Sequence, residues 1–401
     1  MNIVVISTGS GLFRPTNGDR SRFFNLAVQL SKRNRVFVLQ PHMVKDISDF
    51  SIGYTVYFKT DVFGTNVGLL ADFNPIFMLK FLRILTANET DIIQISHPSG
   101  ILASKVLSRL LRRNIPIVYD AHNVDSDSIQ SEKYNIKISN QFIKKLKSRF
   151  SLFFVPLIEK IAANCADYVI SVSEADRVRF IEKFGVDPNK ITVIPNGVQV
   201  STIIPKQDQD LNKYPEIDQD EKISIFFHGS FSQAANFEAF NLIKTYIAPG
   251  YAKIAANEEA IFLMAGTDSP VFEKNNIKSI GFVKDIYSLL REVDIAIVPI
   301  RAGGGTKLKM LDYMGAGLPI VTTKKGIEGI KAKNGEDAII VDDVDEEFID
   351  AIKYLVENEQ ERKRIGANAR KLAEEEYDWE KIGGKLDKLY REISGKHNAN
   401  K

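Results

Sequence analysis

The sequence lacks the residues that staple small secreted domains or hold a metal through thiolates. Its 401 residues include one cysteine, Cys165. An intramolecular disulfide and a cysteine-based metal cluster are therefore excluded, and the absence of disulfides fits a reducing compartment. Neither H-E-x-x-H nor H-x-x-E-H spacing occurs among the five histidines, which argues against a zinc site.

The chain also lacks a long hydrophobic run. Its longest apolar stretches, such as residues 152–158, are far shorter than the roughly 20 residues of a membrane-spanning helix. The first residues, 1–6, carry neither the basic region nor the cleavage site of a signal peptide. We therefore expect a cytoplasmic protein, and contact with the inner face of the membrane stays open.

The chain also lacks a strong overall charge, since its formal net charge is +2. No overall positive electrostatic field therefore favours a nucleic-acid partner. The charge is nevertheless uneven. Residues 1–200 carry 25 Lys and Arg against 17 Asp and Glu, a net of +8, whereas residues 201–401 carry the other 28 and 34, a net of −6. This asymmetry favours two domains with different partners, the basic one suited to an anionic substrate or lipid. Drift in surface composition is the alternative.

A basic segment spans residues 132–150. It holds six Lys and Arg against Glu132 alone, and its apolar residues recur at near-helical spacing. A basic amphipathic helix can rest on anionic lipid, so the segment predicts peripheral membrane contact. A solvated helix face packed on the domain is the equally weighted alternative.

Short β-branched runs alternate with longer amphipathic stretches along most of the chain, which predicts parallel strands covered by helices on both faces of a doubly wound α/β domain. We expect an N-terminal domain over 1–200, a proline-punctuated linker over 201–221, a second α/β domain over 222–375 and a C-terminal helix and tail over 376–401. The tail 394–401 is expected to fray. The predicted strands are 2–7, 35–40, 54–58, 91–96, 116–119, 168–172, 191–195, 223–228, 260–265, 294–299, 318–322 and 338–341, and the clearest predicted helices are 20–32, 99–113, 345–375 and 379–393.

The most informative local segment is 299–323, which reads as a strand, a triple-glycine loop, a short helix and another strand. Gly303–Gly305 allow a ligand to approach the backbone closely. Thr306 is the predicted N-cap of the helix, whose free amides would form an anion site. Lys307 and Lys309 add positive charge. Asp312 shares a helix face with Lys309, where its carboxylate could accept from a pair of ribose hydroxyls.

This segment resembles the donor-binding motif of retaining glycosyltransferase family 4. From Pro299 it reads Pro-x-x-x-Gly-x-Gly-Thr-Lys-x-Lys-x-Leu-acid-x-Met-x-x-Gly-x-Pro-Ile-Val, and the segments 166–174, 193–198, 228–239 and 281–299 resemble further family markers in the right order. The resemblance implies the GT-B fold, in which two Rossmann-like domains face a cleft and a C-terminal helix can return to the N-terminal domain. It also implies an activity.

That activity is metal-independent transfer of a sugar, with retention of configuration, from a nucleotide sugar such as a UDP- or GDP-sugar. The acceptor would be a glycan or a lipid-linked molecule, and no cofactor would be required. The loop 304–309 would hold the diphosphate, and the backbone of Val283 would meet the base. The expected donor-binding residues are Gly18, Gly229, Ser230, Val283, Arg301, Gly304, Gly305, Thr306, Lys307, Lys309 and Asp312.

Two histidines are the expected catalytic residues. His97 follows a predicted strand at its carboxyl end, where ligands sit in such sheets, and the family carries a sugar-orienting histidine in the corresponding loop. His122 follows the next strand and is expected to line the acceptor or donor-sugar region. Asp120 would either orient His122 or cap a loop. His228 is a weaker candidate for the cleft.

The chain departs from the commonest family pattern at three positions. Gly304 stands where many members have a glutamate, and Ser230 and Asn236 stand where many have an Arg and a Lys. We expect Arg301, Lys307 and Lys309 to supply the missing charge. These departures keep two alternatives open: a nucleotide-sugar epimerase of similar fold, and a catalytically silent nucleotide-sugar-binding protein.

Overall fold

A computed structural model describes residues 1–8, 18–41, 54–58, 68–124, 126, 142–203, 222–255 and 260–399. The chain divides into two compact units. Unit 1 comprises residues 1–196 and 379–401, and unit 2 comprises residues 197–378. Most of the expected linker, 204–221, lies outside the described residues.

The core of unit 1 is a seven-stranded parallel sheet. Its spatial order, β3-β2-β1-β4-β5-β6-β7, begins as a dinucleotide-binding fold does. Strands β1, β2, β4, β5 and β6 are buried along most of their length, as expected for strands covered on both faces, which is why their sequences are nearly continuous apolar runs. Each predicted strand of this unit is present: β1 (Asn2–Ile6), β2 (Arg35–Pro41), β3 (Tyr54–Phe58), β4 (Ile92–Ile95), β5 (Ile117–Asp120), β6 (Tyr168–Ser171) and β7 (Ile191–Val193).

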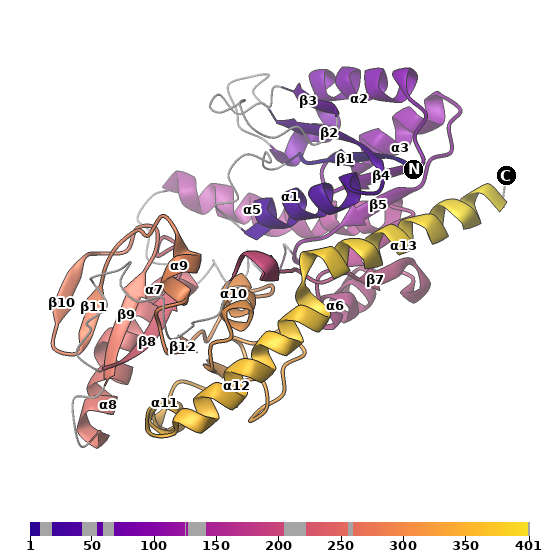
Figure 1. The fold of residues 1–401 in the computed structure, drawn as a ribbon. Coiled ribbons are helices and arrows are strands. Elements are labelled where there is room, and N and C mark those ends of the chain that lie inside the picture. The colour runs from indigo at the N-terminus through magenta and orange to yellow at the C-terminus, as the bar shows by residue number, and fades with distance from the viewer. Residues whose placement is uncertain are drawn as a thin grey trace. The chain divides into compact units, whose positions relative to one another are not determined.

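Helices cover both faces of this sheet (Figure 1). One face packs against α2, α3, α5 and α6, and the other against α1 and the C-terminal helix α13. The predicted helix 99–113 is shorter than expected. The elements are α1 (Gly18–Ser31), η1 (Gly68–Phe73), α2 (Pro75–Ala87), α3 (Ile101–Leu110), α5 (Phe142–Cys165), α6 (Glu174–Phe184), η2 (Pro188–Lys190) and α13 (Trp379–Ala399).

The C-terminal helix belongs to unit 1, as the family resemblance implied. Trp379, Ile382 and Leu386 of α13 are buried against α1 and the sheet. The expectation that residues 394–401 fray is wrong up to Ala399, because α13 continues to that residue. This helix also contributes to a buried polar network, since the Tyr390 hydroxyl donates to Gln94 Oε1 at 2.9 Å.

The same network holds a buried ion pair. Arg22 of α1 donates to Asp120 at the end of β5 through Nε at 3.0 Å and through a terminal nitrogen at 2.7 Å. Arg22 also donates to the carbonyl oxygen of Pro195 at 2.9 Å, and Gln94 Nε2 donates to the other Asp120 oxygen at 3.1 Å. Both charged side chains are essentially fully buried, so the pair depends on these further hydrogen bonds.

Unit 2 contains a second seven-stranded sheet, ordered β10-β11-β9-β8-β12-β13-β14. Its strands are parallel except for β10, which pairs antiparallel with β11. The sequence did not predict this hairpin, whose two strands are three residues each and largely polar. The strands are β8 (Ile223–His228), β9 (Ala260–Ala265), β10 (Phe272–Lys274), β11 (Ile277–Ser279), β12 (Ile295–Val298), β13 (Ile320–Thr323) and β14 (Ile339–Val341).

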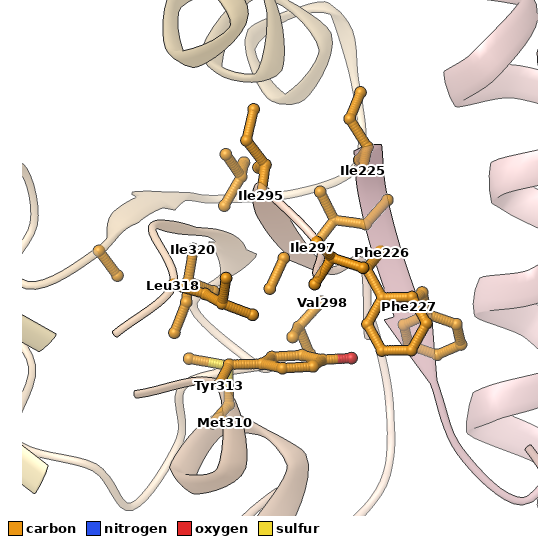
Figure 2. Packing of buried hydrophobic residues seen from close by; sticks show 14 of the residues in the cluster. Ile225, Phe226, Phe227, Ile295, Ile297, Val298, Met310, Tyr313, Leu318 and Ile320 are labelled. Atoms are coloured by element: carbon orange, nitrogen blue, oxygen red, sulfur yellow. The ribbon is translucent and has the colours of Figure 1, made fainter. Parts of the chain in front are cut away.

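The helices of unit 2 pack on this sheet in one continuous hydrophobic core. Figure 2 shows the Tyr313 ring beside Met310 and Val298, with its hydroxyl directed toward the strand that carries Phe226 and Phe227. The elements are η3 (Val200–Thr202), α7 (Ala234–Leu242), η4 (Ile243–Ile247), α8 (Ala248–Ile254), α9 (Ile286–Leu290), α10 (Leu308–Ala316), α11 (Glu346–Glu357), α12 (Glu359–Leu372) and η5 (Ala373–Tyr377).

The strand orders fix where a ligand site is expected. Each sheet reverses its winding at one point, between β1 and β4 in unit 1 and between β8 and β12 in unit 2. Ligands of doubly wound sheets bind outside the carboxyl ends of the strands at such switch points. His97 directly follows β4, whereas Gly229 and the triple-glycine loop follow β8 and β12.

Candidate functional site

The loops that follow β8 and β9 touch through glycines. A Cβ built on Gly229 would lie 2.9 Å from Lys309 Nζ and 2.8 Å from Asn236 Nδ2. A Cβ on Gly266, whose φ is +144°, would lie 1.8 Å from the carbonyl oxygen of Gly229. Glycine at both positions therefore lets the backbone and the ammonium of Lys309 pack without an intervening side chain.

Lys309 reaches this point from the first turn of α10. Its Nζ donates to Asn236 Oδ1 at 2.7 Å and lies 4.0 Å from the centre of the Phe227 ring. Among the described residues, no carboxylate lies within salt-bridge distance of Nζ. Burial and the neighbouring charge of Lys307 lower the pKa of Lys309 to about 7. A cation without a carboxylate partner at a switch point is a ready partner for an anion.

Asp312 lies one turn further along α10. Its Oδ1 accepts from the Tyr287 hydroxyl at 3.3 Å, and its Oδ2 lies 3.8 Å from His228 Nε2. Burial raises the pKa of Asp312 to about 7, although Tyr287 and Lys309 both act to lower it. The carboxylate is only partly satisfied by these neighbours, so it retains capacity to accept from ligand hydroxyls.

The ring of His228 is held in place by Tyr313. The Tyr313 hydroxyl accepts from the His228 backbone N–H at 2.9 Å, and it also lies 2.9 Å from His228 Nδ1. Burial and then Lys309 lower the pKa of His228 to about 3, so the imidazole is neutral. The Tyr313 hydroxyl thus contacts both the backbone N–H and Nδ1 of His228, which leaves Nε2 on the side of Asp312.

The triple-glycine loop is shaped by Lys307. Gly303 and Gly305 have φ values of +109° and +67°. Lys307 Nζ donates to the carbonyl oxygens of Gly304 and Gly305, each at 2.9 Å. The prediction that Thr306 is the N-cap is wrong: Lys307 occupies that position without a side-chain cap bond, and Thr306 Oγ1 is buried without a hydrogen-bond partner among the described residues.

The other predicted donor-binding residues of unit 2 lie at or near this edge of the sheet. Ser230 follows Gly229, and its hydroxyl lies 2.8 Å from that of Ser232. Arg301 is exposed and paired with Asp343, 2.8 Å from Nε to Oδ1. Val283 lies between β11 and α9 and packs partly on the core. The contacts of these three residues do not show whether they bind a donor, so their roles stay predictions.

The predicted residues of unit 1 are distributed over its own sheet edge. His97 is half-buried directly after β4, His122 follows β5, and Gly18 opens α1. His122 Nδ1 is buried without a hydrogen-bond partner among the described residues. Asp120 does not orient His122, because its oxygens accept from Arg22 and Gln94.

The sequence reasoning missed two side chains of the unit 2 site. Tyr287 bonds to Asp312 from the short helix α9, and Tyr313 fixes the His228 ring from α10. Tyr287 shares no motif with its partner, so no sequence signal could have found it. Tyr313 could have been noticed because it directly follows Asp312 within the glycosyltransferase-like segment.

Over the described ranges, no group of three or more His, Cys, Asp or Glu side chains is arranged to hold a metal ion. None of the described helices is both long and apolar enough to cross a bilayer.

Comparison with known proteins gives matches to both halves of the chain. The family model of Glycosyltransferase Family 4 matches residues 17–202, and that of Glycosyl transferases group 1 matches residues 222–358. The capsular polysaccharide biosynthesis glycosyltransferase CapM of Staphylococcus aureus is 22% identical over 361 residues, which are 87% of this chain and 88% of CapM.

Two solved structures share the fold over nearly their whole length. Sucrose-phosphate synthase from Thermosynechococcus elongatus superposes with a TM-score of 0.70 at 16% identity, covering 98% of each chain. HepE from Anabaena, solved with UDP, superposes with a TM-score of 0.69 at 17% identity, covering 98% of this chain and all of HepE. The two family models together cover most of the chain, and it belongs to the glycosyltransferases of the GT-B fold, enzymes that transfer a sugar from a nucleotide sugar.

Proposed function

We propose that this protein transfers a hexose, with retention of configuration and without a metal, from a UDP- or GDP-sugar to a cell-surface glycan or a lipid-linked acceptor. The observation that carries the donor assignment is the ammonium of Lys309, which lies against Gly229 with no carboxylate partner among the described residues. A diphosphate leaving group requires positive charge as its bond to the sugar breaks, and Lys309 supplies it at the switch point of unit 2.

The charge comes from an unexpected element. Asn236 stands where the family resemblance implies a lysine, yet Lys309 Nζ lies 2.7 Å from Asn236 Oδ1. Asn236 also donates to the carbonyl oxygen of Ser230 at 2.9 Å. We infer that α10 delivers the cation that α7 lacks, and that Asn236 holds it beside the Gly229–Ser230 turn. This arrangement favours an active transferase over a silent binding protein.

The nucleoside would bind beside the diphosphate. Asp312 accepts from the ribose hydroxyls, and the backbone near Val283 contacts the base, so the uridine or guanosine lies over α9. Tyr287, which donates to Asp312, holds the carboxylate oxygens in place for the ribose. HepE, whose fold this chain shares, was solved with UDP, which supports a uridine donor as the first to test.

Catalysis would combine the donor site with the histidines of unit 1. His97 orients the donor sugar by hydrogen bonding, and His122 lines the acceptor or sugar region. The leaving phosphate assists deprotonation of the acceptor hydroxyl on the same face of the sugar, which retains the anomeric configuration. CapM acts in capsular polysaccharide biosynthesis by its name, which supports a cell-surface glycan as the product. Residues 132–150 stay a predicted membrane contact; 132–141 and the side chains of 142–150 lie outside the described residues.

The first experiment is calorimetry with a panel of UDP-, GDP- and ADP-sugars, combined with release of the nucleoside diphosphate over hours. One donor that binds and slowly releases its diphosphate supports the transferase. Conversion of the donor to its epimer would instead identify an epimerase, and binding without turnover in the presence of an acceptor panel would favour a silent binding protein. Binding unaffected by EDTA supports metal independence.

Paired lysine variants test the assignment of the cation. Lys309→Met should weaken binding of UDP strongly, because the charge on the diphosphate is lost. Moving the charge back to α7 in the double variant Asn236→Lys/Lys309→Met should recover much of the affinity. A double variant no better than Lys309→Met would show that the position of the ammonium beside Gly229 is not what binds the diphosphate.

A further inference from the structure

Three helices on one face of unit 1 expose apolar side chains. Helices α2, α3 and α5 pack beside one another on the same face of the sheet. The exposed apolar residues of α3 recur every four residues, so they form one stripe. We call the surface made by these and the neighbouring exposed residues the α2–α3–α5 surface; it comprises Phe73, Leu79, Leu102, Val106, Leu110, Phe154, Leu157 and Ile161, which are 37–76% exposed.

This surface is ordered rather than frayed. Phe73, the most exposed member at 76%, ends η1, and two hydrogen bonds fix η1 to the start of α3. The backbone N–H of Ala71 donates to Ser99 Oγ at 3.0 Å, and Asp72 Oδ1 accepts from the N–H of Ala103 at 2.8 Å. The exposed ring is therefore presented by a rigid support, as an anchoring residue requires.

Helices α2 and α3 carry charge of one sign, whereas α5 also contains the buried Glu159. Helix α2 contains Lys80 and Arg83 and no acidic residue, and the sequence between Asp91 and Asp120 contains four Lys and Arg and no acidic residue. Helix α13 on the opposite face mixes both signs, as in its Arg391–Asp387 pair. Basic residues beside an exposed apolar stripe complement an anionic surface into which apolar groups can insert.

A basic cavity adjoins the same helix. It has a volume of about 300 Å³ between β2 and α2. Arg35, Lys80 and Arg83 line it together with the apolar side chains of Phe37 and Ile84, and none of the described residues that line it is acidic. Three basic side chains beside apolar ones can bind a phosphate that is attached to a hydrocarbon chain.

We propose that the α2–α3–α5 surface docks this protein onto an anionic lipid bilayer, with a lipid phosphate headgroup in the cavity between β2 and α2. The apolar side chains enter the headgroup region while the basic side chains contact the anionic lipids. This contact differs from the one predicted for residues 132–150, and it is independent of the donor chemistry. Its purpose would be to hold the enzyme at the bilayer where a lipid-linked acceptor resides.

The test is co-sedimentation of the full chain with vesicles of phosphatidylcholine alone or with a third of phosphatidylglycerol. The protein should bind the anionic vesicles and lose binding as salt is raised. A basic residue near an anionic surface contributes about fivefold to binding, so Arg83→Gln/Arg109→Gln should bind about 25-fold more weakly. Replacing Phe73, Leu79 and Leu110 by Gln should weaken binding at least tenfold, because the apolar insertion is lost.

Matched control variants distinguish binding through this surface from nonspecific binding to the vesicles. Lys381→Gln/Lys388→Gln removes two exposed charges from α13, and Val271→Gln replaces a similarly exposed apolar residue of unit 2; both should bind the vesicles like the original chain. UDP calorimetry on the same variants should be unchanged, which keeps this test apart from that of the proposed function. No binding to anionic vesicles, or equal loss in the controls, would overturn the proposal. So would a dimer in sedimentation velocity that these surface substitutions dissociate, because the surface would then be a self-association face.

Discussion

The lowered pKa of Lys309 makes a sharp prediction about nucleotide binding. The Lys309 side chain is partly buried. The charged groups that face its ammonium are Lys307 and Asp312, and His228 nearby is neutral. Because the pKa is about 7 in the free protein, the cation is progressively lost above neutral pH, whereas a bound diphosphate would keep the lysine protonated. Affinity for UDP should therefore be greatest near and below pH 7 and fall by up to about tenfold per pH unit above it.

Three variants and two calorimetric readouts check this reasoning. Lys309→Met should weaken UDP binding by about 10- to 150-fold at pH 7, since a hydrogen bond to a charged group contributes about 1.5–3 kcal/mol. Lys309→Arg keeps its charge at every accessible pH, so its affinity should not change between about pH 7 and 9, where the phosphate of UDP no longer titrates. Asp312→Asn should retain the alkaline fall.

Calorimetry at pH 8 in buffers of different ionisation enthalpy should show uptake of nearly one proton per UDP by the original chain and none by Lys309→Arg. If Lys309→Arg shows the same alkaline fall and the same proton uptake, another group is responsible and the reasoning is refuted.

Three further predictions concern stability. Burial raises the pKa of Asp312 from 3.8 to about 7, so the folded chain binds more protons than the unfolded chain between about pH 4 and 7, and this contribution to stability is lost as the pH rises through 7. Asp312→Asn should therefore stabilise unit 2 above pH 7 by about 1–3 kcal/mol in urea unfolding, and an unchanged or lower midpoint would contradict the assignment. Gly266→Ala should destabilise unit 2 by more than about 2 kcal/mol, because its Cβ meets the backbone of Gly229, whereas Gly335→Ala, with φ of +73° but open space, should lose only about 1 kcal/mol; equal thermal shifts would argue against the close approach. Arg22→Met should lower the stability of unit 1 by about 3–5 kcal/mol, because it leaves the buried carboxylate of Asp120 without its cation. The single tryptophan, Trp379, is buried in unit 1, so its fluorescence reports that transition, and a loss below about 1 kcal/mol would contradict the buried pair.

The strands were predictable because each is a buried apolar run between polar turns. In β8 and β9, for instance, the predicted bounds 223–228 and 260–265 agree with the structure. Their order across the sheet follows from the doubly wound pattern, which in turn places the loops after β8 and β12 at one switch point. The β10–β11 hairpin escaped because the residues 272–279 have no apolar periodicity to reveal them.

The chemistry inside the site was less predictable than its location. Motif spacing identified Lys309 and Asp312 as neighbours on one helix face, but it could not identify Tyr287, which comes from a separate helix. The spacing also suggested Thr306 as the N-cap, and the helix instead begins after Lys307. Capping depends on the path of three consecutive glycines, and glycine restricts the backbone too little for the sequence to define that path.

Lys307 and Lys309 lie on either side of the start of α10, and this difference in position divides their roles. Lys307 precedes the first turn of α10, so its side chain turns back and donates to the carbonyl oxygens of Gly304 and Gly305. Lys309 lies inside that turn, and its side chain crosses to Gly229 and Asn236. The first charge is used to hold the loop, whereas the second has no carboxylate partner among the described residues. Substitutions at the two positions should therefore have different effects. Loss of Lys307 should change the conformation of the loop, whereas loss of Lys309 removes the charge that the diphosphate would contact.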